Sequence, residues 1–191
     1  MSTLTDRIFA KPTQQSAPRP PSQAQPPPEG VDRGTFAAGC FWGIEAAFRD
    51  IDGVLETAVG YTGGDRVNPS YEQVCRGDTG HAEAVEVWFN PGQVSYEQLL
   101  EIFWRMHNPT TPNRQGWDRG SQYRSAIFFH DARQQELAIS SRENAQTSLR
   151  KPIVTEITQA SEFYPAEDYH QRYFERQGRA ACAMTLRAVS S

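Results

Sequence analysis

The interleaving of strand-type and helix-type segments between residues 33 and 176 constrains the fold of this 191-residue chain more than any other feature. Alternating apolar residues predict strands at 35–38, 54–61, 82–89, 125–130 and 153–158. Apolar residues at helical spacing predict helices in five places: one carrying Trp42 and Phe48, a short one carrying Tyr71 and Cys75, one from about Ser95 to before Pro109, one from Asp131 to about Leu149, and one at 169–176. Such interleaving, two of the strand pairs forming short βαβ units, points to an α/β or α+β two-layer sandwich around one sheet.

Three of the predicted helices begin with an N-capping signal. Ser70 with Gln73 matches the capping box, in which a serine hydroxyl and a glutamine side chain satisfy each other's backbone amides. Ser95 with Gln98 repeats it. Asp131 is a good N-cap, with a glutamine at the third helical position. These signals set the predicted starts of the helices.

Two stretches lack such patterns. Residues 1–30 hold seven of the thirteen prolines and almost no large apolar side chains, which predicts a disordered Pro/Gln-rich arm before a single catalytic domain at 31–191. We favour a tail without function over a docking segment, since most polyproline segments need no partner. Residues 108–122 form a loop rich in Pro, Asn, Gly and charged groups, longer than most connections, and such loops are often functional.

Charge and hydropathy exclude several classes of partner. The net charge of −4 provides no basic field for nucleic acid. No apolar run is long enough for a membrane helix and no secretory signal begins the chain, so we expect no membrane partner and a cytoplasmic location. The three cysteines, Cys40, Cys75 and Cys182, are too far apart for a disulfide-rich scaffold or a C-x-x-C motif. In a reducing compartment they are either inert or chemically active.

Cys40 is the first candidate for chemistry. It follows a strand and a glycine and begins a helix, where unpaired amides and the helix dipole stabilise a thiolate. Glycines on both sides leave the backbone open, and Phe41 and Trp42 place two rings beside the sulfur. The alternative is a buried cysteine that acts only as a small apolar residue.

Glu83 is the second candidate. Strand alternation places it on one face with Val85 and Val87, so that it points toward the core. Burial raises the pKa of a carboxyl, which keeps it protonated and able to donate near neutral pH. In the alternative, the register is shifted and Glu83 is solvated with Glu86. We favour the buried Glu83, because the shifted face would bury Glu86 beside Trp88 and gain nothing.

Other polar side chains carry weaker signals. Tyr71 and Tyr123 could supply neutral hydroxyl donors to an oxygen that gains charge, or could be ordinary aromatic residues. The four histidines show no metal-binding spacing, so we expect no metal site. His170 is interpreted as a structural hydrogen-bonding residue.

The segment Gly39-Cys40-Phe41-Trp42-Gly43 resembles the active-site signature of the A class of peptide methionine sulfoxide reductases. Further segments resemble the family in the same order over roughly residues 33–182: Gly60-Tyr61-Thr62-Gly63-Gly64, Asn68-Pro69-Ser70-Tyr71, the stretch from Gly77 to Val85, Asp118 with the stretch from Gly120 to Ser125, and the stretch from Ala166 to Gln171. The ordered set is far more specific than any one segment.

The resemblance implies an α+β fold, a two-layer sandwich with a ferredoxin-like core, a mixed sheet and long irregular terminal segments. It implies that the Cys40 thiolate attacks the sulfur of methionine S-sulfoxide, in proteins or as the free amino acid, while Glu83 protonates the oxygen. It further implies roles for five other residues: Tyr71 and Tyr123 would hydrogen-bond that oxygen, Asp118 would order the pocket and its water, and Phe41 and Trp42 would hold the methyl group. Cys40 would be left as a sulfenic acid.

The resemblance also bears on recycling. A resolving cysteine would form a disulfide with Cys40, which thioredoxin would reduce, so that no cofactor is needed. Cys182 is the candidate resolving cysteine, because its distance along the chain from His170 resembles that of the first recycling cysteine in family members with two of them. The chain departs from the family pattern here, because residues 178–184 lack a glycine-rich tail and no second C-terminal cysteine follows. Participation of Cys75 therefore stays open, Cys75 being otherwise a passive buried thiol. We expect a monomer.

Two other functions compete with this one. Cys40 could be the nucleophile of a hydrolase or acyltransferase, activated by His81 or His170. The aromatic pocket could also belong to a binding module that captures a small ligand without turnover. Release of methionine from a sulfoxide in the presence of dithiothreitol separates the reductase from both.

Overall fold

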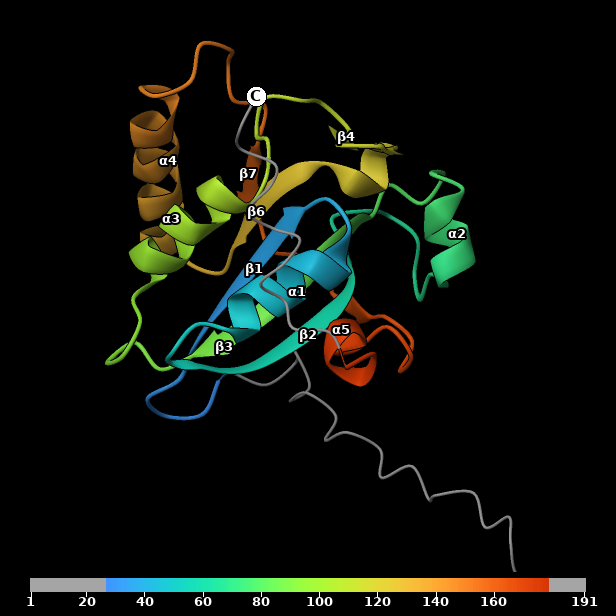
Figure 1. Ribbon diagram of the computed structural model, residues 1–191, viewed down its shortest axis with the longest axis horizontal. Coiled ribbons are helices and arrows are strands. Elements are labelled where there is room, and N and C mark those ends of the chain that lie inside the picture. Colours follow the sequence, from blue (N-terminus) through green and yellow to red (C-terminus); the bar gives the residue numbers. More distant parts are fainter. Residues whose placement is uncertain (1–26, 179–191) are drawn as a thin grey trace, which may run out of the picture.

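The computed structural model describes residues 27–178 (Figure 1), and within them the chain forms a six-stranded mixed sheet with helices and a small two-stranded sheet, an α+β fold as predicted. The strands of the six-stranded sheet, in the order β7-β6-β1-β3-β2-β8 across it, are β1 Asp32–Ala38, β2 Val54–Thr62, β3 Ala82–Phe89, β6 Ser125–Phe129, β7 Glu156–Gln159 and β8 Tyr164–Pro165. The helices are α1 Phe41–Arg49, α2 Tyr71–Cys75, α3 Tyr96–Met106, α4 Ala132–Gln146 and α5 Tyr173–Arg176.

The ferredoxin-like core is present in the strand order. β3 lies between β1 and β2 and is antiparallel to both, while β6 lies antiparallel on the other side of β1. The units β1-α1-β2 and β3-α3-β6 are therefore split βαβ units, each with one strand of the other unit inserted. The parallel pair of β6 and β7, joined by α4, makes the sheet mixed.

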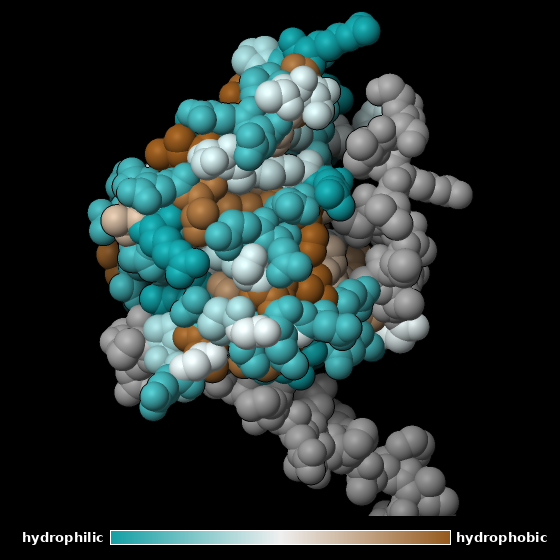
Figure 2. Space-filling view, turned by 90° about the vertical axis from the view of Figure 1, so that its left-hand side faces the viewer, coloured by the Kyte–Doolittle hydropathy of each residue, from teal (hydrophilic) through white to brown (hydrophobic). Residues whose placement is uncertain are grey.

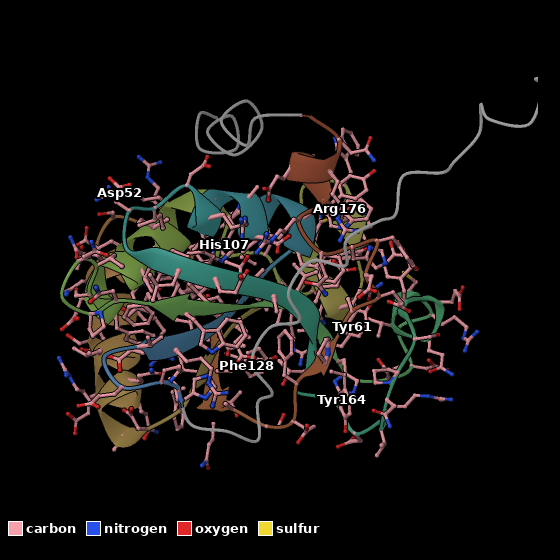
Figure 3. The ribbon with its side chains drawn as sticks, turned by 90° about the horizontal axis from the view of Figure 1, so that it is seen from below. Asp52, Tyr61, His107, Phe128, Tyr164 and Arg176 are labelled. Atoms are coloured by element: carbon pink, nitrogen blue, oxygen red, sulfur yellow. The ribbon has the colours of Figure 1, made fainter. Side chains whose placement is uncertain are left out.

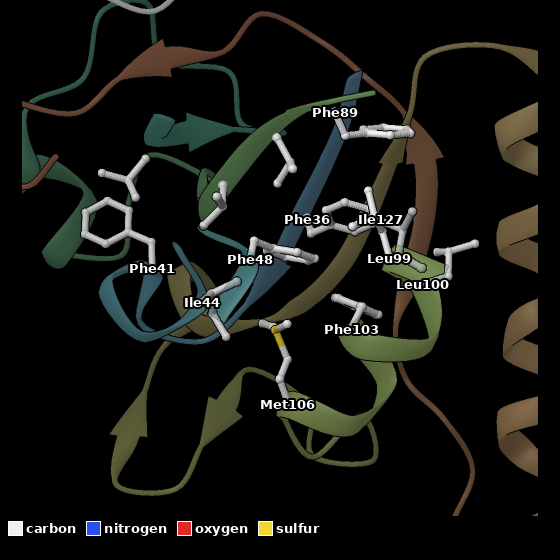
Figure 4. Close-up of a cluster of buried hydrophobic side chains, with 14 of the residues drawn as sticks. Phe36, Phe41, Ile44, Phe48, Phe89, Leu99, Leu100, Phe103, Met106 and Ile127 are labelled. Carbon is white, nitrogen blue, oxygen red and sulfur yellow. The ribbon is translucent and has the colours of Figure 1, made fainter. Parts of the chain in front are cut away.

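The two faces of the sheet are built differently because side chains alternate along each strand. One face carries large apolar residues that pack against α1, α3 and α4, and Figure 4 shows Phe36, Phe48 and Phe103 meeting there. The other face carries mostly alanines, with Trp88 and Phe128, and the C-terminal segment covers it with Phe163. Helices thus cover one face and irregular chain contributes to the other.

The helix starts follow the predicted capping. Ser70 and Ser95 each complete a capping box with the glutamine three residues on. The Asp131 side chain accepts from the Gln134 backbone N–H at 2.8 Å. α4 is largely polar. Figure 2 shows the side of the molecule that bears α3 and α4, and this surface is mostly hydrophilic with small apolar patches.

Several boundaries differ from the prediction. α4 ends at Gln146 rather than about Leu149, and β7 begins at Glu156 rather than at residue 153. The last helix begins only at Tyr173, because Arg172 has a left-handed backbone with φ of 52°. The loop at 108–122 contains a two-stranded hairpin and a 3-10 turn at 121–123, and β8 was not predicted. Strands of only two residues carry too few side chains to show an alternation.

Two predictions concern parts of the chain that the structure describes only in part. The arm at 1–30 falls almost wholly outside the described residues, and so does the end of the domain predicted at 31–191. Both stay predictions. Among residues 27–178, none of the helices is long and apolar enough to cross a membrane.

Candidate active site

Cys40 caps the N-terminus of α1, as the sequence predicted. Gly39, with φ of 99°, turns the chain from β1 into the helix. The backbone N–H groups of Trp42 and Gly43 lower the pKa of the thiol, but burial and the nearby charge of Glu83 outweigh them and raise it to about 12. Desolvation in the site without substrate thus opposes the stabilisation of a thiolate by the helix terminus that the sequence indicated.

Glu83 points to the same place from the neighbouring strand. Its side chain is only 2% exposed, and its Oε2 accepts from the Phe41 backbone N–H at 3.2 Å. Burial raises the pKa of this carboxyl to about 7, although the Phe41 N–H bond lowers it. The predicted register, with Glu83 facing the core, is thus confirmed, and the acid lies at the first turn of the helix that Cys40 caps.

Glu86 is also buried, which the sequence argument did not foresee. Both faces of β3 are covered, so Glu86 lies on the alanine-rich face at 1% exposure. There it pairs with Arg33, with 3.0 Å between Nη1 and Oε1. The partly buried Arg33 charge compensates the buried Glu86 carboxylate. The pattern of one strand face does not reveal such a pair.

The three other predicted polar residues lie within electrostatic reach of the same pair. Burial and the charges of Glu83, Asp118 and Cys40 raise the pKa of Tyr123, which keeps its hydroxyl neutral. Burial likewise raises the pKa of Tyr71, whose hydroxyl donates to the Cys75 sulfur. The charge of Asp118 in turn raises the pKa of both Cys40 and Glu83. The structure thus brings Cys40, Glu83, Asp118, Tyr71 and Tyr123 into one cluster.

The two aromatic residues after Cys40 have different surroundings. Phe41 is 1% exposed and packs inward against Tyr61. Trp42 is partly exposed, stacks on Tyr173 with ring centroids 4.0 Å apart, and donates its Nε1–H to His170 Nδ1 at 3.1 Å. Phe41 therefore lies deep beneath the site, while Trp42 has exposed area beside it. His170 has the hydrogen-bonding role that the sequence suggested.

Two carboxylates that support the site were missed. Glu167 accepts from the Tyr71 backbone N–H and from the Tyr61 hydroxyl, both at 3.0 Å, and so holds α2 against β2. Glu45, on the buried face of α1, accepts from the Arg172 backbone N–H at 2.8 Å. A carboxylate on the apolar face of an element was a usable signal for Glu45 on its helix, as it was for Glu83 on its strand. Glu167 lies in the stretch from Ala166 to Gln171 that resembles the family, but no local pattern indicated its role.

The histidines offer no base to Cys40. The ring nitrogens of His81 lie against backbone groups of Gly64 and Arg66, at 3.1 and 2.7 Å. His170 uses Nδ1 on Trp42 and is enclosed by aromatic rings. The hydrolase hypothesis therefore loses the activating imidazole it needs. No group of three His, Cys, Asp or Glu residues within 27–178 could hold a metal ion.

The remaining cysteines differ in what the structure says of them. Cys75, at the end of α2, is exposed rather than buried, so the expectation of a buried thiol is wrong. Burial of part of its surface and the charge of Glu83 raise the pKa of its thiol, which places it near the cluster. Cys182 lies outside the described residues.

Gly39 gives a first test of the local geometry. A Cβ at Gly39 would lie 2.8 Å from Cβ and Cγ of Gln115 and would strain a backbone with positive φ, so we expect Gly39→Ala to lower the free energy of unfolding by about 1–3 kcal/mol. Gly43→Ala is the matched control, since a Cβ there meets nothing within 4 Å and alanine favours the helix by about 0.5–1 kcal/mol. Urea unfolding measures both. Equal stability of the two variants would contradict this geometry.

Comparison with known proteins gives consistent results. The family described as Peptide methionine sulfoxide reductase matches residues 32–191. Peptide methionine sulfoxide reductase MsrA of Methanosarcina acetivorans is 59% identical over 154 residues, which cover 80% of this chain and 82% of that protein. The reduced form of Mxr1 from Saccharomyces cerevisiae superposes with a TM-score of 0.78 at 35% identity, covering 84% of this chain and 93% of Mxr1. Mxr1 in complex with Trx2 superposes with a TM-score of 0.57 at 27% identity, covering 78% and 88%.

Proposed function

The chain belongs to the peptide methionine sulfoxide reductase family and is a peptide-methionine (S)-S-oxide reductase of its A class, and on this premise we propose that Cys40 attacks the sulfoxide sulfur while Glu83 protonates the oxygen. The observation that carries the proposal is the buried Glu83 carboxyl, hydrogen-bonded at the first turn of the helix that Cys40 caps. A carboxyl with a pKa of about 7 holds a proton at neutral pH and gives it up readily.

The reaction transfers one oxygen atom from the substrate sulfur to Cys40. The Cys40 sulfur bonds to the sulfoxide sulfur while Glu83 gives its proton to the oxygen. The proton lost by the Cys40 thiol replaces the one that Glu83 gave. The hydroxyl then moves from the substrate sulfur to the Cys40 sulfur. The S–O bond of the substrate and the transient S–S bond both break, methionine leaves, and Cys40 is left as a sulfenic acid. Cys40 is oxidised by two electrons, the substrate sulfur is reduced by two, and no net proton is consumed.

Cys40 becomes a better nucleophile in the complex of substrate with the form of the enzyme in which Glu83 is protonated. The charge of Glu83 is one reason why the pKa of Cys40 is high, and that charge is absent when Glu83 is protonated. A bound sulfoxide adds the positive end of its S–O dipole beside the thiol. Both changes lower the pKa of Cys40, so the attacking form is a thiolate produced in the complex.

The neighbouring residues hold the substrate in place. Tyr123, kept neutral by burial, donates to the oxygen as its charge develops, and Tyr71 joins it by turning its hydroxyl from Cys75. Asp118 orders the pocket and its water. Trp42 supplies an apolar wall for the methyl group, supported from below by Phe41. The substrates are methionine S-sulfoxide residues of proteins and the free amino acid.

Regeneration uses thiols and no cofactor. The Cys40 sulfenic acid condenses with a resolving thiol to a disulfide and water, and a thioredoxin reduces that disulfide. Formation of a complex between Mxr1 and Trx2 supports a thioredoxin as the partner. A reducing compartment such as the cytoplasm suits this cycle, and the enzyme acts as a monomer.

Turnover of the two sulfoxide epimers tests the proposed function. We incubate the full chain with methionine S-sulfoxide or R-sulfoxide and dithiothreitol, and measure methionine. Methionine from the S epimer alone is expected, since one enzyme class serves each epimer. Binding of the S epimer without methionine would support the binding module. Ester or amide hydrolysis without consumption of dithiothreitol would support the hydrolase.

Cys182→Ser tests the resolving step. We expect this variant to release one methionine per enzyme in the first turnover, while thioredoxin-driven turnover falls at least about tenfold, because the sulfenic acid finds no partner thiol. Cys75→Ser is the control and keeps thioredoxin-driven turnover. Full thioredoxin-driven activity in Cys182→Ser would move the role to Cys75 or elsewhere, and mass mapping of the disulfide after one substrate equivalent identifies the pair.

A further inference from the structure

Trp117 has no place in the chemistry above and yet is 97% exposed. It lies in the turn between β4 Arg114–Gln115 and β5 Asp118–Arg119, the short hairpin of the long loop. An indole is a large apolar group that usually finds burial, and full exposure has a cost in solvation. Because tryptophan is enriched at the contact surfaces of proteins, a fully exposed indole is a candidate contact point.

The hairpin lies directly against the active site. On one side of Trp117, Gln115 packs so closely on Gly39 that a Cβ at Gly39 would lie 2.8 Å from it. On the other side, the charge of Asp118 raises the pKa of Cys40 and of Glu83. Figure 1 shows the hairpin at the same end of the molecule as α2, which carries Tyr71. The exposed ring is thus attached to the rim of the catalytic cluster.

Hydrogen bonds fix the hairpin in shape. The Gln115 side chain donates to the Asn108 carbonyl at 2.7 Å and accepts from its backbone N–H at 3.1 Å. The Arg114 side chain donates to the Gly116 carbonyl at 2.9 Å, and the Gly120 backbone N–H donates to the Asn113 carbonyl at 2.9 Å. A turn held in this way loses little conformational entropy when a partner contacts its tip.

A second exposed aromatic residue belongs to the same region. Tyr169 is 57% exposed, and its ring packs against His170 in a tilted arrangement with centroids 4.1 Å apart. His170 in turn packs against Phe41, Trp42 and Tyr71. Exposed aromatic surface therefore flanks the cluster on two separate segments of the chain, which a single small substrate in the site would leave uncovered.

We propose that Trp117 is a docking point for an apolar side chain that flanks the sulfoxide residue in an extended polypeptide substrate. This inference rests on the proposed function and names polypeptides as the substrates that Trp117 helps to bind. Free methionine sulfoxide has one side chain, which enters the Cys40 site and leaves nothing for Trp117. A polypeptide brings neighbouring side chains, and methionines that are buried in folded proteins have apolar neighbours when unfolding exposes them.

The experiment compares three substrates across matched variants. Trp117→Ala, Trp117→Phe and the wild type reduce, with dithiothreitol, free methionine S-sulfoxide, a peptide with the S-sulfoxide between leucines, and the same peptide with serines. Leu55→Ala is the control, because Leu55 is 53% exposed and lies near the start of β2. Asp52, just before that strand, lies at the opposite end of β2 from Tyr61 in Figure 3.

We expect Trp117→Ala to lower kcat/KM for the leucine peptide about tenfold, as partial burial of an indole predicts. The values for the free amino acid and the serine peptide should stay within about twofold, as for other exposed substitutions. Trp117→Phe should keep most of the activity, and Leu55→Ala all of it.

Other outcomes overturn the inference. An equal loss on all three substrates would mean that Trp117 acts on the catalytic cluster through its neighbour Asp118. A loss only when thioredoxin replaces dithiothreitol would make the hairpin a surface for the reductant. No loss on the leucine peptide would remove any docking role. Failure of the proposed function is distinguishable from all of these, because the wild type would then release no methionine from the free amino acid.

Discussion

Cys40→Ser is expected to lower kcat/KM for methionine S-sulfoxide by at least about 10⁴-fold, which leaves no turnover above background. A serine oxygen is a far weaker nucleophile toward sulfur than a thiolate, and it cannot accept the oxygen atom to form a sulfenic acid. Methionine release with dithiothreitol measures the effect. The first turnover is measured as well, because loss of chemistry removes it whereas loss of recycling does not.

Cys75→Ser is the matched control for this prediction. It removes a second thiol close to the same cluster without touching the proposed nucleophile. We expect it to keep turnover with dithiothreitol within about threefold, as exposed substitutions usually do. Normal activity of Cys40→Ser, or loss of the first turnover in Cys75→Ser, would show that the attacking sulfur has been assigned to the wrong residue.

Glu83→Gln is expected to lower kcat/KM by about 10²–10⁴-fold, less than loss of the nucleophile. The amide still donates a hydrogen bond to the sulfoxide oxygen but cannot give up a proton at useful cost. The same assay measures it, with the peptide or the free sulfoxide as substrate. Activity close to that of the wild type would mean that the proton comes from another group, and Tyr123 would be the next candidate.

The pH dependence of kcat/KM distinguishes proton donation from a structural effect. Burial raises the pKa of Glu83 to about 7, so the protonated acid is the dominant form below pH 7 and is lost as the pH rises above it. The wild type should therefore lose activity through a group with that pKa on the alkaline side, in opposition to the gain from ionisation of Cys40. Glu83→Gln should lack this alkaline loss.

Glu86→Gln is the control for Glu83→Gln. Its carboxyl is equally buried on the same strand, and burial raises its pKa to about 7 as well, but it lies on the other face of the sheet with Arg33. We expect normal kcat/KM and an unchanged pH profile, together with a lower free energy of unfolding, because the ion pair between Arg33 and Glu86 is lost. A catalytic defect in Glu86→Gln would show that burial of a carboxyl in β3 matters more than its face.

Sequence reasoning determined what depends on short-range physics. Capping at Ser70, Ser95 and Asp131 set three helix starts, because the hydrogen bonds involved join residues three positions apart. Alternation in β3 aimed Glu83 at the core, because successive side chains of a strand point to opposite faces. Both signals are local, so neither needed knowledge of the rest of the fold.

Tertiary structure alone decided the properties that arise from packing between distant segments. The direction of the Cys40 pKa depends on how much water the surrounding elements exclude, and desolvation outweighs the helix terminus that the sequence reveals. Burial of Glu86 depends on what covers the second face of the sheet, and exposure of Cys75 on what leaves α2 uncovered. The contact of Gln115 with Gly39, which brings Trp117 to the rim of the cluster, joins segments that only the fold places side by side. Desolvation and long-range contact are sums over the whole fold, which is why no local pattern of residues could state them.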